Sequence, residues 1–195
     1  MPPSVSALMR VIGARRSVRA YLEHPANDDQ IHYIVRCVER FMARMQFTLP
    51  VIRVIGRGER FDQVIRAASS GLLGKISPWL RTTKAGHLLV CACQVPDEGS
   101  GVFEQALIQA AMTLQIAVLA ATELGLGTCW IAGIDHKRVE DVFALPPGAQ
   151  LMALCTLGYP QPDSGLSFDA LAKRFVSPRR KPLDALWMRD RWSAS

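Results

Sequence analysis

The sequence of 195 residues lacks the usual signals of a disulfide framework or a metal site. It has five cysteines, an odd number, and no two of them form a CxxC pair. Its four histidines are scattered, without the spacing that zinc ligands show. Isolated cysteines inside apolar runs are typical of small buried thiols in a reducing compartment. The pattern therefore predicts no metal site and a cytoplasmic protein.

Long apolar runs are also missing. The most apolar stretch, residues 106–121, is shorter than the ~20 residues that a membrane-spanning helix needs, and it contains Gln109, Thr113 and Gln115. The first residues, 1–4, are not followed by the apolar core of a signal peptide. We therefore interpret residues 106–121 as a buried helix and expect no membrane partner.

Lysine and aromatic residues are scarce. Five lysines stand against 18 arginines, the net charge is +6, and aromatic residues make up only 7% of the chain. The two basic clusters, residues 10–19 and 174–181, lack the interleaved aromatic residues of a nucleic-acid platform. Most of the arginines are interpreted as solvated surface charges. An anionic small molecule remains the partner that the two clusters favour, and no nucleic acid is expected.

What the sequence does contain predicts one α+β domain. Hydrophobic residues make up 49% of the chain, enough for a single core. Ser4, and Asn27 with Gln30, are predicted helix N-caps, and Gly125 is a predicted C-cap. The elements do not alternate strictly, so we expect a central mixed or antiparallel sheet flanked by helices, with about 160–195 as a C-terminal arm. The apolar periodicity predicts helices at 4–14, 27–47, 59–68, 102–124, 135–143 and 183–192, and strands at 51–56, 87–93, 128–134 and 150–158.

Three arginines, Arg15, Arg16 and Arg19, surround Ser17 within five residues. Guanidinium groups form bidentate hydrogen bonds with phosphate oxygens, and a serine hydroxyl adds one more donor. Cations this close repel one another, so burying them together requires an anion. The alternative is a basic helix end that the helix dipole stabilises. The spacing alone leaves both interpretations open.

Four motifs, taken in order along the chain, resemble the nitroreductase family. They are Arg-Arg-Ser-Val-Arg-Ala-Tyr at 15–21, a long helix at 104–124 that leads into Gly-Leu-Gly-Thr-Cys-Trp-Ile-Ala-Gly at 125–133, Leu-Gly-Tyr-Pro at 157–160, and Arg-Arg-Lys-Pro-Leu at 179–183. The resemblance implies a nitroreductase-like FMN-binding fold. It also implies an FMN-dependent oxidoreductase that passes a hydride from NAD(P)H through flavin N5 to a nitroaromatic, a quinone or a similar acceptor. No catalytic side chain is expected, because the flavin carries the chemistry.

The resemblance also implies which residues contact the flavin. Arg15, Ser17 and Arg19, with Arg180 from the C-terminal segment, would hold the phosphate and the ribityl chain. Arg16 would lie over the flavin or the ribityl chain. Both basic clusters would then converge on one dianionic group, which gives a reason for the positive net charge.

Two further sets of residues are expected at the isoalloxazine ring. Ala132 and Gly133 would line the ring near N5, where only small residues allow a close approach. Arg81 is placed like the family's basic residue near the N1–O2 edge, with Lys84 as the second choice; a surface position is the alternative for both. The glycines at 125–127 are not a dinucleotide fingerprint, because they follow a helix and open a strand.

The chain departs from the family where a substrate would bind. The family has an asparagine-containing turn after its second helix, whereas residues 42–50 contain no asparagine, and only Gln46 or Thr48 would replace it. A second family asparagine is replaced around Pro78. A flavin-binding or sensory module with little turnover is therefore the alternative function. The resemblance further implies a homodimer, and the apolar residues of segment 183–192 predict an arm that wraps the partner.

Overall fold

The described part of the computed structural model comprises residues 6–43, 50–70, 77–95, 101–131 and 133–162. These residues lie in a compact unit that spans residues 1–162, and residues 163–195 form a second unit. The predicted C-terminal helix at 183–192 lies outside the described residues. The elements, in order, are α1 (Ala7–Ala14), α2 (Asp28–Met42), β1 (Val51–Gly56), α3 (Glu59–Ala68), the 3₁₀ helix η2 (Pro78–Thr82), β2 (His87–Gln94), α4 (Gly101–Glu123), β3 (Gly127–Ile131), α5 (His136–Phe143) and β4 (Ala149–Gly158).

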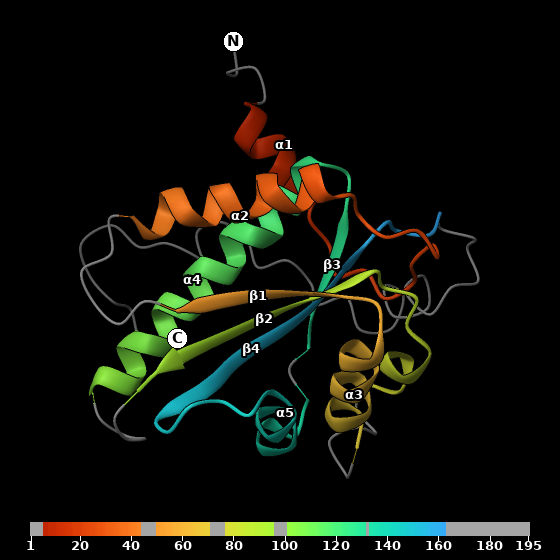
Figure 1. The fold of residues 1–195 in the computed structure, drawn as a ribbon. Helices are drawn as coiled ribbons and strands as arrows, with labels where there is room; N and C mark the ends of the chain where they lie inside the picture. The colour runs from red at the N-terminus through yellow and green to blue at the C-terminus, as the bar shows by residue number, and fades with distance from the viewer. Residues whose placement is uncertain (1–5, 44–49, 71–76, 96–100, 132, 163–195) are drawn as a thin grey trace, which may run out of the picture. The chain divides into compact units, whose positions relative to one another are not determined.

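One antiparallel sheet lies at the centre of the compact unit. Its strand order is β1-β2-β4-β3, and each neighbouring pair is antiparallel. Helices α2 and α4 cover one face of the sheet, and α3 and α5 cover the other (Figure 1). The predicted α+β class with a central sheet flanked by helices is therefore confirmed, in its antiparallel form.

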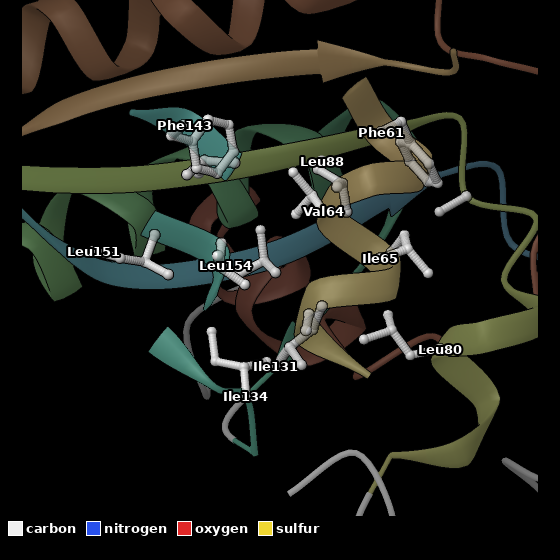
Figure 2. Packing of buried hydrophobic residues seen from close by; sticks show 14 of the residues in the cluster. Phe61, Val64, Ile65, Leu80, Leu88, Ile131, Ile134, Phe143, Leu151 and Leu154 are labelled. Carbon is white, nitrogen blue, oxygen red and sulfur yellow. The ribbon is translucent and has the colours of Figure 1, made fainter. Parts of the chain in front are cut away.

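Each face of the sheet buries its own hydrophobic cluster. Successive residues of a strand point to opposite faces, so Leu88 packs with the α3 and α5 residues while Leu89 packs with those of α2 and α4. Figure 2 shows the first cluster, in which Phe61, Val64 and Ile65 of α3 pack near Leu88. The sheet is thus buried on both sides, which explains why its central strands are almost continuously apolar.

Local sequence signals set most helix ends. The predicted capping box of α2 is present, because the Asn27 side chain accepts from Gln30 N at 2.9 Å and the Gln30 side chain accepts from Asn27 N at 3.1 Å. Gly125 has a φ of 76° after α4, as the predicted C-cap requires. The prediction for α1 was wrong: Ser6 caps it by accepting from Met9 N at 3.2 Å, and Ser4 lies outside the described residues.

The prediction of a buried helix is confirmed for one side of the long helix α4 only. Leu107, Ile108 and Met112 are 45%, 58% and 43% exposed. The sheet and α2 cover only one side of α4, and its opposite side carries apolar residues that nothing in the described part of the chain covers. Of the helices searched in that part, α4 is the one that is long and apolar enough to cross a membrane, a test that core helices also pass.

Strand β3 is shorter than predicted. Its pairing with β4 begins at Gly127 opposite Gly158 and stops at Ile131 opposite Leu154, whereas the sequence predicted a strand to residue 134. Ile134 is instead buried in the same cluster as Ile131 (Figure 2). Because β3 has only β4 as its neighbour in the sheet, the chain is free to leave the sheet and turn toward α5.

Candidate functional site

The basic segment that follows α1 is extended and runs beside β3. Arg15 ends α1 with an extended backbone, and Ser17 forms a parallel bridge with Thr128. Val18 N donates to Thr128 O at 2.9 Å, and Leu22 N donates to Tyr159 O at 2.9 Å. These bonds fix the backbone of residues 17–22 against the sheet edge, so the side chains between them have defined directions.

Two apolar anchors, Val18 and Tyr21, hold this segment in the core. They are only 4% and 2% exposed. The Tyr21 hydroxyl donates to Val18 O at 2.5 Å and lies 2.7 Å from Thr156 Oγ1. The Val18 methyl groups also fill the space that a side chain at Gly127 would need, at 2.8 Å from an ideal Cβ. No role for Thr156 was predicted from the sequence, because only the fold brings this residue to Tyr21.

Arg15 is the unusual residue of the segment. It is half-buried, and its Nε is buried without a hydrogen-bond partner within the described ranges. None of the ion pairs found there includes it. Burial raises the pKa of the Cys155 thiol, and the positive charge of Arg15 acts on the same thiol in the opposite direction. The Nε of Arg15 is thus buried, and no ion pair among the described residues compensates the charge of its guanidinium.

Arg16, Ser17 and Arg19 are all half-buried and share this segment with Arg15. Arg16 and Arg19 each have an interaction partner. Three of the four predicted phosphate residues, Arg15, Ser17 and Arg19, thus lie with Arg16 on one extended segment, residues 15–19 (the basic strip), anchored at Val18 and Tyr21. The fourth, Arg180, lies outside the described residues.

The predicted ring residues follow the other end of β3. Gly133 lies at a bend after β3, half-buried, between the core residues Ile131 and Ile134. Ala132 lies outside the described residues. Since Ser17 pairs with Thr128 near the start of β3 and Gly133 follows its end, one strand connects the predicted phosphate end with the predicted ring end.

Arg81 lies in η2 and is tied to α3. Its Nη2 donates to Ser69 O at 2.9 Å, just beyond the last residue of α3. Its neighbour Leu80 is fully buried in the cluster that also contains Val18 and Ile131. A single hydrophobic cluster therefore positions the basic segment after α1, the helix η2 and the residues that follow β3, which are the segments with predicted site residues. Figure 2 shows Leu80, Ile131 and Ile134 within it.

Lys84, the second choice for the ring cation, already has a partner. Its Nζ lies 3.2 Å from Glu23 Oε1, and both side chains are largely exposed. Pro78, which replaces the family asparagine, is the first residue of η2. The other two substitutes considered, Gln46 and Thr48, lie outside the described residues. Of the two candidate cations, Lys84 forms an ion pair with an acid, whereas the described contact of Arg81 is with a backbone carbonyl.

The buried thiols and the largely apolar cavity described next lie apart from the basic strip. Burial raises the pKa of Cys91 to about 12 and that of Cys93 to about 11, so both thiols stay protonated. Across the described ranges, no three His, Cys, Asp or Glu side chains could hold a metal ion together. The described residues that line an apolar cavity of about 460 Å³ between α2, β1 and α4 include Glu39 and no basic residue, so they do not suit an anion.

Comparison with known proteins places the chain in a structural class. The model of the nitroreductase family matches residues 79–159. Nitroreductase A from Vibrio parahaemolyticus aligns over 98% of this chain and 79% of its own, with a TM-score of 0.76 and 16% identity. The NADPH:FMN oxidoreductase from Vibrio harveyi, solved in complex with NAD⁺, aligns over 97% and 80%, with a TM-score of 0.74 and 16% identity.

For a third solved structure, a nitroreductase family protein from Clostridium novyi NT, the alignment includes a larger share of that protein's chain. It aligns over 84% of this chain and 90% of its own, with a TM-score of 0.65 and 20% identity. Among curated protein sequences, none matches this chain. The predicted resemblance to the nitroreductase family and the nitroreductase-like fold are both confirmed; at these identities, the solved structures establish the fold.

Proposed function

We propose that this chain, which has the nitroreductase-like fold and matches the nitroreductase family model, is an FMN-dependent oxidoreductase. Its partners are NAD(P)H and a small-molecule acceptor such as a nitroaromatic or a quinone, with no nucleic acid and no membrane involved, and its compartment is the cytoplasm. The neighbouring NADPH:FMN oxidoreductase supports the reaction class by analogy. The chemistry of this chain's own residues supports the cofactor.

Arg15 carries the proposal. A half-buried guanidinium whose Nε has no described partner is costly, because both its charge and its donor have lost water. A phosphate group compensates both at once, since it accepts bidentate hydrogen bonds and carries negative charge. Ser17 and Arg19, on the same anchored strip, add further donors, and Arg180 completes the set from the C-terminal segment. The strip therefore fits the phosphate end of FMN.

The ring end uses other residues. FMN, when bound, supplies the acceptance and release of a hydride that amino acid side chains lack. Ala132 and Gly133 provide a backbone N–H and a surface without bulky side chains beside N5, and Arg16 covers the ribityl chain or the ring. Arg81 provides positive charge at the N1–O2 edge, where negative charge accumulates on reduction. The hydrogen bond from Arg81 to Ser69 O supports this role because it holds the guanidinium in place.

A flavin spectrum tests the cofactor. The purified protein should be yellow or should gain flavin absorbance when FMN is added, and it should bind FMN more tightly than riboflavin, which lacks the phosphate. Colourless protein that binds neither would overturn the proposal. Anaerobic titration with NADH and with NADPH then tests turnover. Bleaching supports the oxidoreductase, whereas bound flavin that stays oxidised with both would support the binding or sensory module.

We also propose a homodimer in which the exposed side of α4 meets a second copy. Apolar residues are exposed on α4 and also on α1, where Leu8 and Met9 are 62% and 60% exposed. A soluble monomer rarely leaves this many apolar residues uncovered, and the two helices that carry them, α1 and α4, are in contact. The C-terminal arm, about residues 160–195, would embrace the partner and bring Arg180 to the phosphate.

A charged side chain introduced on this apolar surface tests the dimer. Ile108→Glu should give monomers in size-exclusion chromatography with light scattering. Val51→Glu is the matched control, because Val51 on β1 is also 58% exposed but lies on another element. Monomeric wild-type protein, or an Ile108→Glu variant that stays dimeric, would contradict the proposal. Truncation from Leu183 should give monomers without flavin, and a flavin-bound monomer would refute the role of the arm.

A further inference from the structure

Thr128 has a buried hydroxyl group that the protein leaves without a partner. The residue is 1% exposed, and its Oγ1 is buried without a hydrogen bond within the described ranges. Thr128 forms the parallel bridge with Ser17, so the two side chains point to the same face of the local sheet. Trp130, two residues further along β3, points to this face as well, and so does Cys155, which pairs with Trp130.

Arg15 lies close to Thr128 in the fold because both are next to Ser17. Arg15 precedes Ser17 by two residues and has an extended backbone, and Thr128 is the bridge partner of Ser17. The positive charge of Arg15 opposes the effect of burial on the pKa of the Cys155 thiol. Ser17 is therefore flanked, along the chain and across the bridge, by two residues that each bury an unpartnered polar atom.

Both of these unpartnered atoms are able to donate a hydrogen bond. Arg15 Nε only donates, and the Thr128 hydroxyl donates whenever an acceptor is present. They do not bond to each other, and each orphaned buried group is costly. A phosphate oxygen accepts from both and carries the charge that Arg15 needs. No described protein acceptor performs this function.

We propose that Thr128 is a phosphate-binding residue whose hydroxyl donates to the same phosphate group as Arg15 Nε. This inference rests on the proposed FMN site and adds to it a residue outside the basic motif. It predicts that Thr128 discriminates FMN from riboflavin, because the hydroxyl group contacts only the part of FMN that riboflavin lacks. One hydrogen bond to a charged group corresponds to about a 10- to 100-fold change in affinity.

The substitution Thr128→Val tests the proposal because it removes the hydroxyl and keeps the shape. The dissociation constants of FMN and riboflavin would be measured by quenching of flavin fluorescence, and the thermal midpoint of the flavin-free protein by circular dichroism. We expect FMN affinity to fall about 10- to 100-fold, riboflavin affinity to change less than about threefold, and the flavin-free protein to be as stable as the wild type or more stable. Thr128→Ser, which keeps the hydroxyl, should retain FMN affinity within about threefold.

Thr113→Val is the matched control. Thr113 on α4 is also fully buried, and its Oγ1 also lacks a partner in the described part of the chain, but it does not pair with the basic strip. This variant should leave the ratio of the two affinities unchanged. Inorganic phosphate should compete with FMN on the wild type and more weakly on Thr128→Val.

The outcomes separate this inference from the proposed function. A wild type that prefers FMN, with the same preference in Thr128→Val, would overturn the role of Thr128 and leave the cofactor proposal standing. Equal losses of FMN and riboflavin affinity, or a less stable flavin-free variant, would show a structural hydroxyl and overturn it too. A wild type that binds neither flavin would overturn both proposals.

Discussion

Two arginines, Arg15 and Arg57, differ in whether the protein provides hydrogen-bond partners for the guanidinium group. Arg57 is exposed, yet its guanidinium donates to Thr83 O and, from Nε, to Ala85 O at 3.3 Å, and it lies 4.9 Å above the Phe61 ring. Arg15 is more buried, and its Nε has no described partner. Burial alone would have favoured the opposite arrangement, since the buried donor needs compensation most.

The difference separates structural arginines from ligand-binding ones. Arg57 joins the loop before β2 to α3, so its described contacts stabilise the fold. Arg15 belongs to the segment that Val18 and Tyr21 anchor, while its buried Nε donor has no described partner. A binding site needs side chains that are positioned in advance and not yet satisfied, because this lowers the cost of ordering them when the ligand binds. Four predictions test this comparison, in order of decreasing effect.

The largest effect is expected for Arg15→Met, which keeps the length of the side chain and removes its charge. FMN affinity should fall about 100-fold or more, because a bidentate, charge-assisted contact is lost. The flavin-free protein should be as stable as the wild type, or more stable, because an uncompensated buried charge disappears. Flavin titration and urea unfolding measure the two quantities. A variant that loses stability and keeps FMN would reverse the assignment of the two arginines.

The second prediction concerns the anchor of the strip. Tyr21→Phe removes a buried hydroxyl that bonds Val18 O and contacts Thr156 Oγ1, so the free energy of unfolding should fall by about 1–3 kcal/mol. FMN affinity should fall less than in Arg15→Met. Tyr33→Phe is the control: Tyr33 is exposed and bonds Glu123 at 2.7 Å, so its loss should matter less. Equal effects of the two substitutions in urea unfolding would show that Tyr21 is no special anchor.

For Arg57→Met we expect the reverse of Arg15→Met. The free energy of unfolding should fall by about 1–2 kcal/mol, because two carbonyl contacts and the contact with the Phe61 ring are lost. FMN affinity should stay within about twofold of the wild type, since none of these contacts touches the basic strip. Substantial loss of FMN would mean that the loop before β2 belongs to the site after all.

The smallest effect is a pH dependence from His87, a second partly buried basic group without a described partner at Nδ1. Burial lowers its pKa, against the opposing charge of Asp28. The unfolded chain therefore takes up the proton first, and stability present above about pH 6.5 is lost as the pH falls toward the folded pKa. Unfolding of His87→Gln between pH 7 and pH 5 should show a shallower loss; an identical slope would exclude His87.

The sequence determined the local elements and the kinds of side chain. The Asn27–Gln30 capping box, the glycine after α4 and the apolar runs of β2 and β4 follow from interactions between residues near one another in the chain. It placed the end of β3 three residues too late and predicted α4 as a buried helix, although one side of α4 is exposed. Both errors concern what lies beside an element, which depends on strand pairing and layer packing.

The basic motif shows the same division. The sequence by itself placed Arg15, Arg16, Ser17 and Arg19 together and offered a phosphate site and a basic helix end as alternatives. Only the tertiary structure decided that the strip lies against β3, that Tyr21 reaches Thr156, and that Thr128 stands beside Ser17. The reason is that burial and hydrogen-bond satisfaction are properties of neighbours in space, and Thr128 comes 111 positions after Ser17 in the chain.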